Sequence, residues 1–208
     1  MTITFETIRY QFEHLSSVMN ENKDFLIELD SAIGDGDLGL TMSAGFAAVV
    51  ESMNKAAETD IGRALMQAGM TMNNAAPSTM GTLIASALLR MAQATKGKKA
   101  ISDVEYVEMC KAAVAGIQDR GKADVGDKTI LDALVPATRA LEEAVESGAS
   151  LQDSLEKAAS AAEEGFDRTS TLVSKHGRGH YYGEKSKGHK DPGAAVGMLI
   201  FKGLRDSL

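Results

Sequence analysis

Apolar residues recur at intervals of three and four along much of this chain, and that spacing constrains its fold more than any other feature. Such spacing places them on one side of an α-helix, whereas a half-buried strand alternates every second residue. The two clearest stripes consist of Phe5, Ile8, Phe12, Leu15 and Met19, and of Val107, Cys110, Val114 and Ile117. A composition with 11 methionines, 3 prolines and no tryptophan also favours helix. We therefore expect an all-α fold with both stripes packed in its core.

Breaks in the periodicity divide the chain into about eight helices. Their expected ranges are 3–22, 41–55, 60–73, 79–95, 102–119, 128–146, 150–175 and 193–206. The capping-box spacing of Ser102 and Glu105, and the weaker version at Ser150 and Asp153, mark two of the helix starts. No linker or fixed-period repeat interrupts the pattern, so we expect residues 1–208 to form a single domain. The expected architecture is an antiparallel up-and-down bundle or barrel of eight helices.

The connections between these helices fall into two groups that alternate along the chain. Four are rich in Gly, Asp or Lys, or unusually long, and contain residues 30–39, 73–78, 120–127 and 175–192. The other three, at 56–59, 95–101 and 147–149, are typical of short surface turns. Alternate connections of an up-and-down bundle emerge at the same end, so the four unusual loops are expected to meet at one rim. Such a rim, with helix N-termini nearby, suits a phosphate and its metal ions; loops that only turn corners are the alternative.

Three carboxylates fall within a short glycine-rich segment. Asp30, Asp35 and Asp37 are separated by glycines that allow a tight turn, and unpaired like charges so close together are costly without a cation. Hard oxygen ligands with no nearby His or Cys favour Mg²⁺ or Ca²⁺. An EF-hand is excluded, because the twelfth position counted from Asp35 is Phe46 and not a bidentate Glu. We interpret the three aspartates as candidate metal ligands, with a solvated acidic turn as the alternative.

Residues 121–129 (GKADVGDKT) are similar to a phosphate-binding P-loop, except that Asp127 stands between the second glycine and Lys128. A helix rather than a strand is expected before them, and an acidic side chain in a phosphate cradle would repel the ligand. We therefore expect Lys122 and Lys128 to be solvated rather than bound to phosphate. Gly121 is interpreted as a position that lets another group approach closely.

The last long connection carries Arg178 and three histidines. The histidines are His176, His180 and His189. A loop of about 17 residues is usually functional or disordered, and a lid over a bound nucleotide would explain its length. Taken singly, each histidine is expected to be a surface or loop-packing residue. Asp191 followed by Pro192 has the ordinary chemistry of a helix start.

Charge and cysteine content exclude several classes of protein. The chain has 22 Lys+Arg against 29 Asp+Glu, a net charge of −7 without a long basic run, so binding of nucleic acid is not expected. The single Cys110 excludes a disulfide framework and a zinc ribbon, and it suits a reducing compartment. The first residues lack a signal-peptide pattern and no stretch approaches 18 apolar residues. We expect a cytoplasmic protein with no membrane segment.

Three segments together resemble the L subunit of dihydroxyacetone kinases. They are Leu29–Met42 (LDSAIGDGDLGLTM), Arg120–Thr129 (RGKADVGDKT) and Gly177–Ala194 (GRGHYYGEKSKGHKDPGA), and the resemblance covers essentially the whole chain. It implies a barrel of eight antiparallel helices that holds ADP or ATP and two Mg²⁺ ions at one rim. The implied metal ligands are Asp30, Asp35 and Asp37. The implied nucleotide contacts are Leu38, Gly39, Leu40, Thr41, Thr79, Met80, Gly121, Ile130, Arg178, Asp191, Pro192 and Gly193.

The same resemblance implies a division of labour, in which a separate K subunit holds the ketose and the L subunit delivers the γ-phosphoryl group. A free-standing L chain favours ADP that is retained as a coenzyme and rephosphorylated by a phosphohistidine phosphocarrier, whereas Thr41 is similar to the ATP-using members. The turn at Pro77–Gly81 departs from the family pattern, which leaves a four-carbon ketose open beside dihydroxyacetone. A nucleotide sensor, a metal-dependent phosphohydrolase and a homodimeric assembly also stay open.

Overall fold

The computed structural model describes residues 2–55 and 59–208, and these are mostly helical. The α-helices are α1 (Phe5–Glu21), α2 (Lys23–Ile33), α3 (Leu38–Lys55), α4 (Ile61–Ala75), α5 (Thr79–Ala94), α6 (Asp103–Gly121), α7 (Leu131–Glu146), α8 (Leu151–Arg168) and α9 (Pro192–Asp206). Two 3₁₀ segments, η1 (Thr169–Thr171) and η2 (Arg178–Ser186), precede α9, and β1 (Ile3–Thr4) pairs antiparallel with β2 (Ala100–Ile101). The expected all-α class is confirmed, while residues 56–58 of one expected turn lie outside the described residues.

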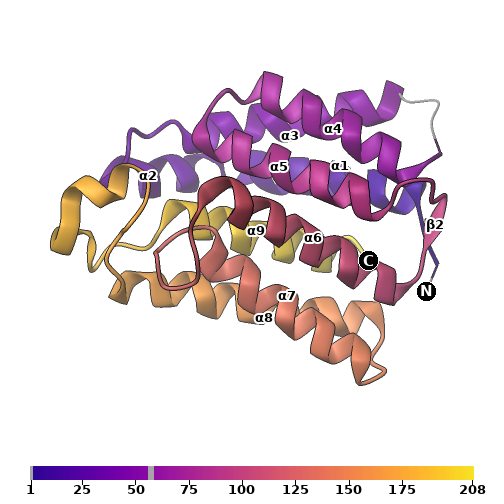
Figure 1. Ribbon diagram of the computed structural model, residues 1–208. Helices are drawn as coiled ribbons and strands as arrows, with labels where there is room; N and C mark the ends of the chain where they lie inside the picture. Colours follow the sequence, from indigo (N-terminus) through magenta and orange to yellow (C-terminus); the bar gives the residue numbers. More distant parts are fainter. Residues whose placement is uncertain (1, 56–58) are drawn as a thin grey trace.

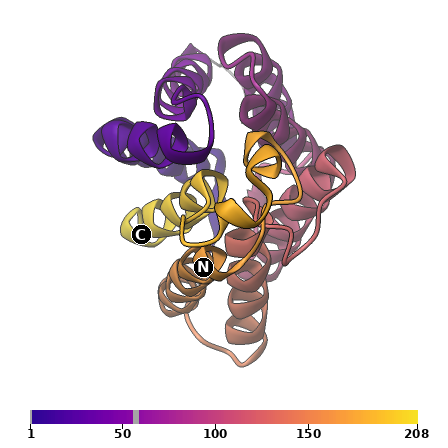
Figure 2. The same ribbon diagram turned by 90° about the vertical axis from the view of Figure 1, so that its left-hand side faces the viewer.

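The long helices pack in a closed order (Figures 1 and 2). Helix α1 packs against α3, and the contacts continue through α4, α5, α6, α7, α8 and α9 back to α1. This is the order of neighbours that a closed up-and-down arrangement gives. Helix α9 also packs against α7, and α2 contacts η2 at one end of the molecule. None of the helices in the described part of the chain is long and apolar enough to cross a bilayer.

Side-chain caps fix several helix starts. The Ser102 hydroxyl accepts from the backbone N–H of Glu105, whose carboxylate accepts from the N–H of Ser102, so the predicted capping box is confirmed. Ser150 accepts from the N–H of Asp153 at the start of α8. The Asp191 carboxylate caps α9 in the same way, through a backbone N–H three residues further on. These bonds satisfy N–H groups that a helix terminus would otherwise leave unpaired.

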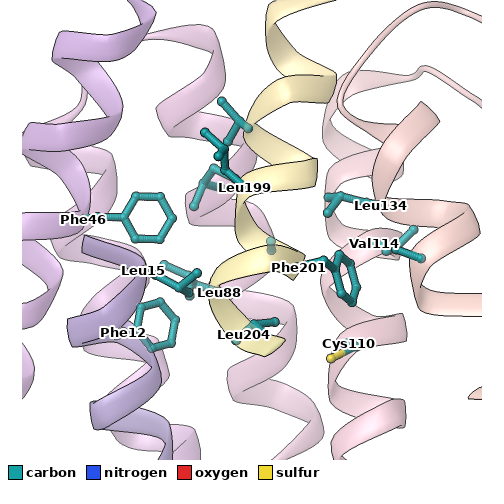
Figure 3. Packing of buried hydrophobic residues seen from close by; sticks show 14 of the residues in the cluster. Phe12, Leu15, Phe46, Leu88, Cys110, Val114, Leu134, Leu199, Phe201 and Leu204 are labelled. Carbon is teal, nitrogen blue, oxygen red and sulfur yellow. The ribbon is translucent and has the colours of Figure 1, made fainter. Parts of the chain in front are cut away.

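The predicted apolar stripes form part of the core (Figure 3). All members of the α1 and α6 stripes are buried. The rings of Phe12 and Phe46 stack with their centroids 6.4 Å apart, and this pair joins α1 to α3. Leu199 and Phe201 of α9 point into the same interior, and Cys110 lies among these apolar side chains as expected. The core therefore fixes the helices whose ends carry the long loops.

Helix α2 was not expected, because residues 23–33 lie between the helices predicted over 3–22 and 41–55. Only Asn22 separates α2 from α1, with φ −98° and ψ 15°, and its side-chain amide donates to the Val18 carbonyl. Asn is a weaker helix breaker than Gly or Pro, and its bond to the preceding turn redirects the chain without a longer loop.

The helix expected over 150–175 ends earlier, at Arg168. Thr169 is fully buried there, and its hydroxyl oxygen accepts from the backbone N–H of Asp191 while donating to the Phe166 carbonyl. A contact with the start of α9 thus sets the end of α8. No local pattern in the sequence predicts this contact.

Candidate functional site

A cavity of about 1050 Å³ opens at the end of the molecule where α2 and η2 lie. Its walls include Asp35 from the first of the four unusual loops, Pro77 from the second, Gly121 from the third and Arg178 from the fourth. Segments that are far apart in the sequence therefore meet around one space, as the alternation of loops predicted.

Most of the predicted site residues line this cavity. They are Asp30, Asp35, Asp37, Leu38, Thr79, Met80, Gly121, Ile130, Arg178, Asp191, Pro192 and Gly193. Gly39, Leu40 and Thr41 are not among its lining residues. Leu40 is 54% exposed, and Gly39 lies so close to α2 that a Cβ there would be 2.1 Å from the Lys23 carbonyl oxygen. The first turn of α3 thus presents Leu38 to the cavity, while Gly39 packs against α2.

The three candidate metal ligands lie together at the cavity wall. Each offers a carboxylate oxygen, and these oxygens all lie within 4.8 Å of one another. Asp30 is in the last turn of α2, whereas Asp35 and Asp37 belong to the turn that leads into α3. A Cβ at Gly34 would be 2.1 Å from Oδ1 of Asp30, and Gly36 has a φ of +76°. Glycine at these positions is what allows the chain to fold tightly around the Asp30 carboxylate.

Asp30 is the buried member of this cluster, and its Oδ2 accepts from the backbone N–H groups of Asp37 at 3.1 Å and Leu38 at 3.3 Å. Burial raises the pKa of Asp30, the N–H donors offset part of that rise, and the charge of Asp35 adds to it. The guanidinium of Arg178, from η2, lies 2.6 Å from the Asp35 carboxylate and supplies a positive charge beside the cluster. Convergent carboxylate oxygens of this kind suit a hard divalent cation.

Several helix N-termini also face the cavity. Helices α3, α5 and α9 begin at Leu38, Thr79 and Pro192, and each of these residues lines it. A helix N-terminus carries partial positive charge and unpaired N–H groups, which stabilise a bound anion such as phosphate. Carboxylates for a cation and N-termini for an anion are therefore present in the same cavity.

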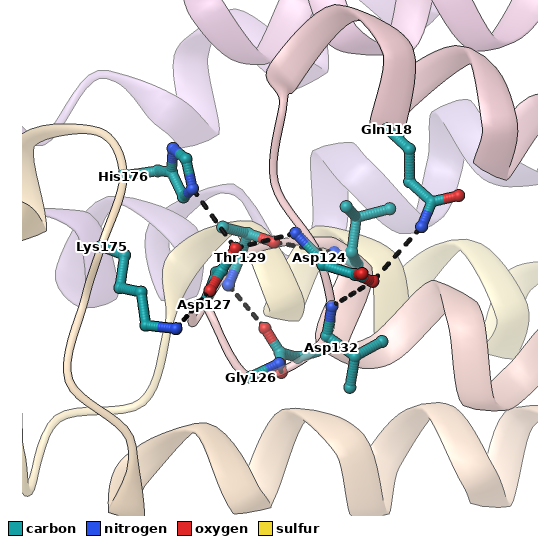
Figure 4. A network of polar contacts seen from close by, with 10 residues as sticks. Gln118, Asp124, Gly126, Asp127, Thr129, Asp132, Lys175 and His176 are labelled. Atoms are coloured by element: carbon teal, nitrogen blue, oxygen red, sulfur yellow. Dashed lines mark hydrogen bonds and ion pairs between the residues drawn. The ribbon is translucent and has the colours of Figure 1, made fainter.

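The glycine-rich loop after α6 is organised by acidic side chains (Figure 4). Asp132 accepts from backbone N–H groups of the loop, including that of Gly126 at 2.7 Å. Asp127 lies 2.7 Å from the Lys175 ammonium and 3.3 Å from Nε2 of His176, and these contacts, led by the Lys175 hydrogen bond, lower its pKa. The residue that breaks the P-loop pattern thus ties this loop to the connection before α9. Residues 172–191, between η1 and α9, are called the lid segment below.

Lys128 is not solvated, contrary to the expectation. It is 1% exposed, and its ammonium group donates to the backbone carbonyls of Leu172, Ser186 and His189 in the lid segment. Lys122 is exposed, as expected. The two lysines differ because the lid segment folds over one of them and not the other.

Ser174 lines the cavity but was not predicted as a site residue, since it fell within the helix expected over 150–175. Its side chain is 3% exposed, and its hydroxyl oxygen has no hydrogen-bond partner among the described residues. A buried hydroxyl at the cavity wall is available to a ligand. Lys128, by contrast, could be noticed in the sequence, because it lies in the glycine-rich loop.

Asp191 is a buried carboxyl at the same wall. Burial raises the pKa of Asp191 to about 7, and the backbone N–H of Ala194 opposes that rise. The negative charge of Asp132 raises the pKa further, whereas the positive charge of Lys128 lowers it. Asp191 therefore changes protonation near neutral pH, whereas an exposed Asp does so near pH 4.

Comparison with known proteins shows which family the chain resembles along most of its length. The DAK2 domain matches residues 32–206 of this chain. The ADP-binding subunit DhaL of the PEP-dependent dihydroxyacetone kinase of Escherichia coli (strain K12) is 37% identical over 187 residues, which cover 90% of this chain and 89% of that subunit. The L-erythrulose 1-kinase of Mycolicibacterium smegmatis is 31% identical over 198 residues, which cover 94% of this chain and 34% of that protein.

A solved structure has the same fold. The dihydroxyacetone kinase of C. freundii, crystallised in complex with AMP-PNP and Mg²⁺, superposes with a TM-score of 0.74 and 23% identity. The match covers 96% of this chain and 33% of that one, so this chain spans about a third of the larger kinase.

Proposed function

Since the chain belongs to the DAK2 domain family, we propose that it is the nucleotide-binding subunit of a short-chain ketose kinase of the dihydroxyacetone type. Relatives that match along nearly their whole length are named as ADP-binding subunits of dihydroxyacetone kinases. We further propose that residues 1–208 act as one domain, that the chain transfers the γ-phosphoryl group to a ketose held by a separate K subunit, and that it works in the cytoplasm. The observation that carries the proposal is the convergence of Asp30, Asp35 and Asp37 at a cavity that is also faced by helix N-termini.

We propose that the cavity holds a nucleoside diphosphate with two Mg²⁺ ions. Asp30, Asp35 and Asp37 would hold the metal ions, which when bound supply neutralisation of the phosphate charge. The N-termini of α3, α5 and α9 would stabilise phosphate oxygens through their backbone N–H groups. Arg178 would approach from the lid segment and either pair with a phosphate or stack on the base. Thr79, Met80, Gly121 and Ile130 would form the remaining wall.

Phosphoryl transfer asks little covalent chemistry of a protein, because positioning and charge stabilisation provide most of the catalysis. The cavity is consistent with that requirement: its side chains supply charge and shape, and we assign no general base on this chain. The ketose would be held and activated by the partner subunit, while this chain orients the donor.

Two donors are compatible with the site. The relatives that share this chain's length are named as PEP-dependent or PTS-dependent, which favours ADP that stays bound and is rephosphorylated by a phosphocarrier. Thr41 favours exchangeable ATP, and the 31% identity to an L-erythrulose 1-kinase makes a four-carbon ketose the second candidate substrate. A subunit that senses nucleotide without transferring phosphate is the non-catalytic alternative.

Calorimetry and reconstitution test the proposal. The purified chain is expected to bind Mg·ADP, and Asp35→Asn is expected to lose most of that affinity; equal binding by both proteins would contradict the assignment. Mixing the chain with a K-type subunit, a phosphocarrier system or ATP, and dihydroxyacetone or erythrulose identifies donor and ketose. A sensor would yield no sugar phosphate in any mixture. Nucleotide that co-purifies and survives dialysis supports the coenzyme role.

A further inference from the structure

We propose that Lys128 is a positioning residue for the nucleotide site, because its ammonium group holds the lid segment where Arg178 faces the aspartates. The inference rests on the proposed function, since it concerns how that same site is assembled. Lys128 lies at the cavity wall, but its N–H groups are bonded to the protein. It therefore acts through the lid segment and not through a contact of its own with the nucleotide.

Three carbonyl groups from distant parts of the lid segment converge on Nζ of Lys128. The distances are 3.2 Å to Leu172, 2.5 Å to Ser186 and 2.7 Å to His189. Leu172 precedes η2, Ser186 is the last residue of η2, and His189 follows it. One side chain from the loop before α7 thus joins both ends of the lid segment to each other and to that loop.

The three acceptors match a charged lysine. An ammonium has three N–H groups, whereas a neutral amine has two and would leave one carbonyl without its donor. Burial lowers the pKa of Lys128, and the negative charge of Asp191 opposes that effect. Removal of the ammonium would leave buried carbonyl groups without a hydrogen-bond donor. Displacement of the carbonyl groups would leave a buried charge without acceptors, and both states are costly. Each side therefore depends on the other.

The backbone of Lys128 is also unusual. Its φ is +62°, a left-handed conformation that is uncommon for a residue with a Cβ and that persists only where the surroundings impose it. Lys122, in the same loop, also has a positive φ, of +53°, where it ends α6. Lys122 has the same side chain and a similar φ but is exposed, whereas Lys128 is buried. Lys122 is therefore a matched control for substitutions of Lys128.

The lid segment also contacts this loop through Lys175 and His176, both at Asp127. The Lys175 N–H donates to the Asp127 carbonyl at 3.1 Å, but the ion pair between their side chains involves an exposed lysine and is worth little. Within the lid segment, the backbone N–H of Ser174 donates to the hydroxyl of Ser186. The backbone carbonyl of Ser186 in turn accepts from the ammonium of Lys128. Loss of the ammonium therefore loosens the support of Ser174 and, through the same segment, the placement of Arg178.

The experiment compares Lys128→Met with Lys122→Met in the full-length chain. Hydrogen exchange is measured without nucleotide at the amides of Ser174, Lys175 and Gly188, which the structure shows hydrogen-bonded. The Lys128 variant is expected to exchange faster at these amides while α1 and α3 to α5 stay as protected as in wild type. Its Kd for Mg·ADP is expected to rise about tenfold or more, because misplacement of a positioning group weakens every contact that it supports. Lys122→Met is expected to change neither measurement.

A merely structural role would lower the folded fraction and leave the Kd of the folded protein unchanged. Unchanged exchange in the lid segment, exchange raised equally in every helix, or an unchanged Kd would each overturn the proposal. If Lys128→Met does not fold, Lys128→Arg carries the test, since it keeps the charge and should fold with faster exchange confined to the lid segment. Failure of both variants to fold would make Lys128 a stabiliser of the whole fold and contradict the proposal.

The two hypotheses fail in different ways. If the wild-type chain does not bind Mg·ADP, the proposed function is wrong, and the exchange data without nucleotide still report whether Lys128 anchors the lid segment. If the wild type binds and Lys128→Met binds equally well, the proposed function stands and the inference falls.

Discussion

The guanidinium of Arg178 lies 2.6 Å from the carboxylate of Asp35, which joins the lid segment to the acidic cluster. This ion pair places a positive charge beside three carboxylates that would otherwise repel one another. A bound metal ion would draw Asp35 away from this ion pair, and a bound phosphate would draw Arg178 away from it. Arg178 and Asp35 should therefore have separable effects on metal and nucleotide.

Arg178→Met tests that separation. Without the guanidinium, no positive charge offsets the negative charge of the three carboxylates. Mn²⁺ alone should therefore bind as well as in wild type or a few-fold more tightly. Mg·ADP should bind more weakly, because a cation that would contact the nucleotide is gone. Titration with each ligand by calorimetry measures the two effects. A parallel loss of both affinities would contradict this account.

Gly34→Ala tests whether the tight turn shapes the cluster. The added Cβ would lie 2.1 Å from Oδ1 of Asp30, so the carboxylate must move away from its present position. We expect metal binding to weaken by about tenfold or more, as for other changes that displace ligands. Ser31→Ala is the control, since Ser31 is an exposed residue in the last turn of α2, next to Asp30, and its hydroxyl donates to the Ile27 carbonyl. Equal metal affinity in the two variants would argue against the role of Gly34.

Asp191→Asn tests the raised pKa of the buried carboxyl. A folded-state pKa of about 7, above the unfolded value near 4, means that the folded protein retains a proton that the unfolded chain has released between those pH values. The contribution of Asp191 to stability is therefore present at low pH and is lost as pH rises toward 7. Urea unfolding across this range should show that decline in wild type and not in the variant. The same pH slope in both proteins would contradict the assignment.

Cys110 should be unreactive in the native protein. Burial raises the pKa of its thiol to about 12, so neither the thiolate nor access for a reagent is available at neutral pH. A disulfide reagent should label the thiol only after unfolding in denaturant. Rapid labelling of the folded chain would show that the core around α6 opens.

Ser102→Ala tests the capping box of α6. Loss of the side-chain cap should lower the free energy of unfolding by about 1 kcal/mol. Ser17→Ala is the matched control, because Ser17 lies within α1 on an exposed surface and caps no helix. Chemical denaturation of both variants gives the comparison, and equal stability losses would contradict the role of the cap.

Much of the fold followed from local patterns. The stripe from Phe5 to Met19 is buried along its length, because a helix repeats every 3.6 residues whatever surrounds it. The capping box at Ser102, the side-chain cap at Ser150 and the acidic start of α9 are similarly local. Helix α2 was missed because its boundary at Asn22 is a single residue with a weak breaking tendency, and the choice between turn and helix depended on packing against α3 and α9.

The candidate site divides along the same line. The sequence alone predicted that Asp30, Asp35 and Asp37 lie close together, since the intervening glycines permit a tight turn within eight residues, and the structure confirms it. Only the tertiary structure decided that Lys128 is buried, that Ser174 faces the cavity and that Arg178 meets Asp35. These contacts join residues that are distant in the chain. Their energies depend on burial and on acceptors that exist only after the helices have packed.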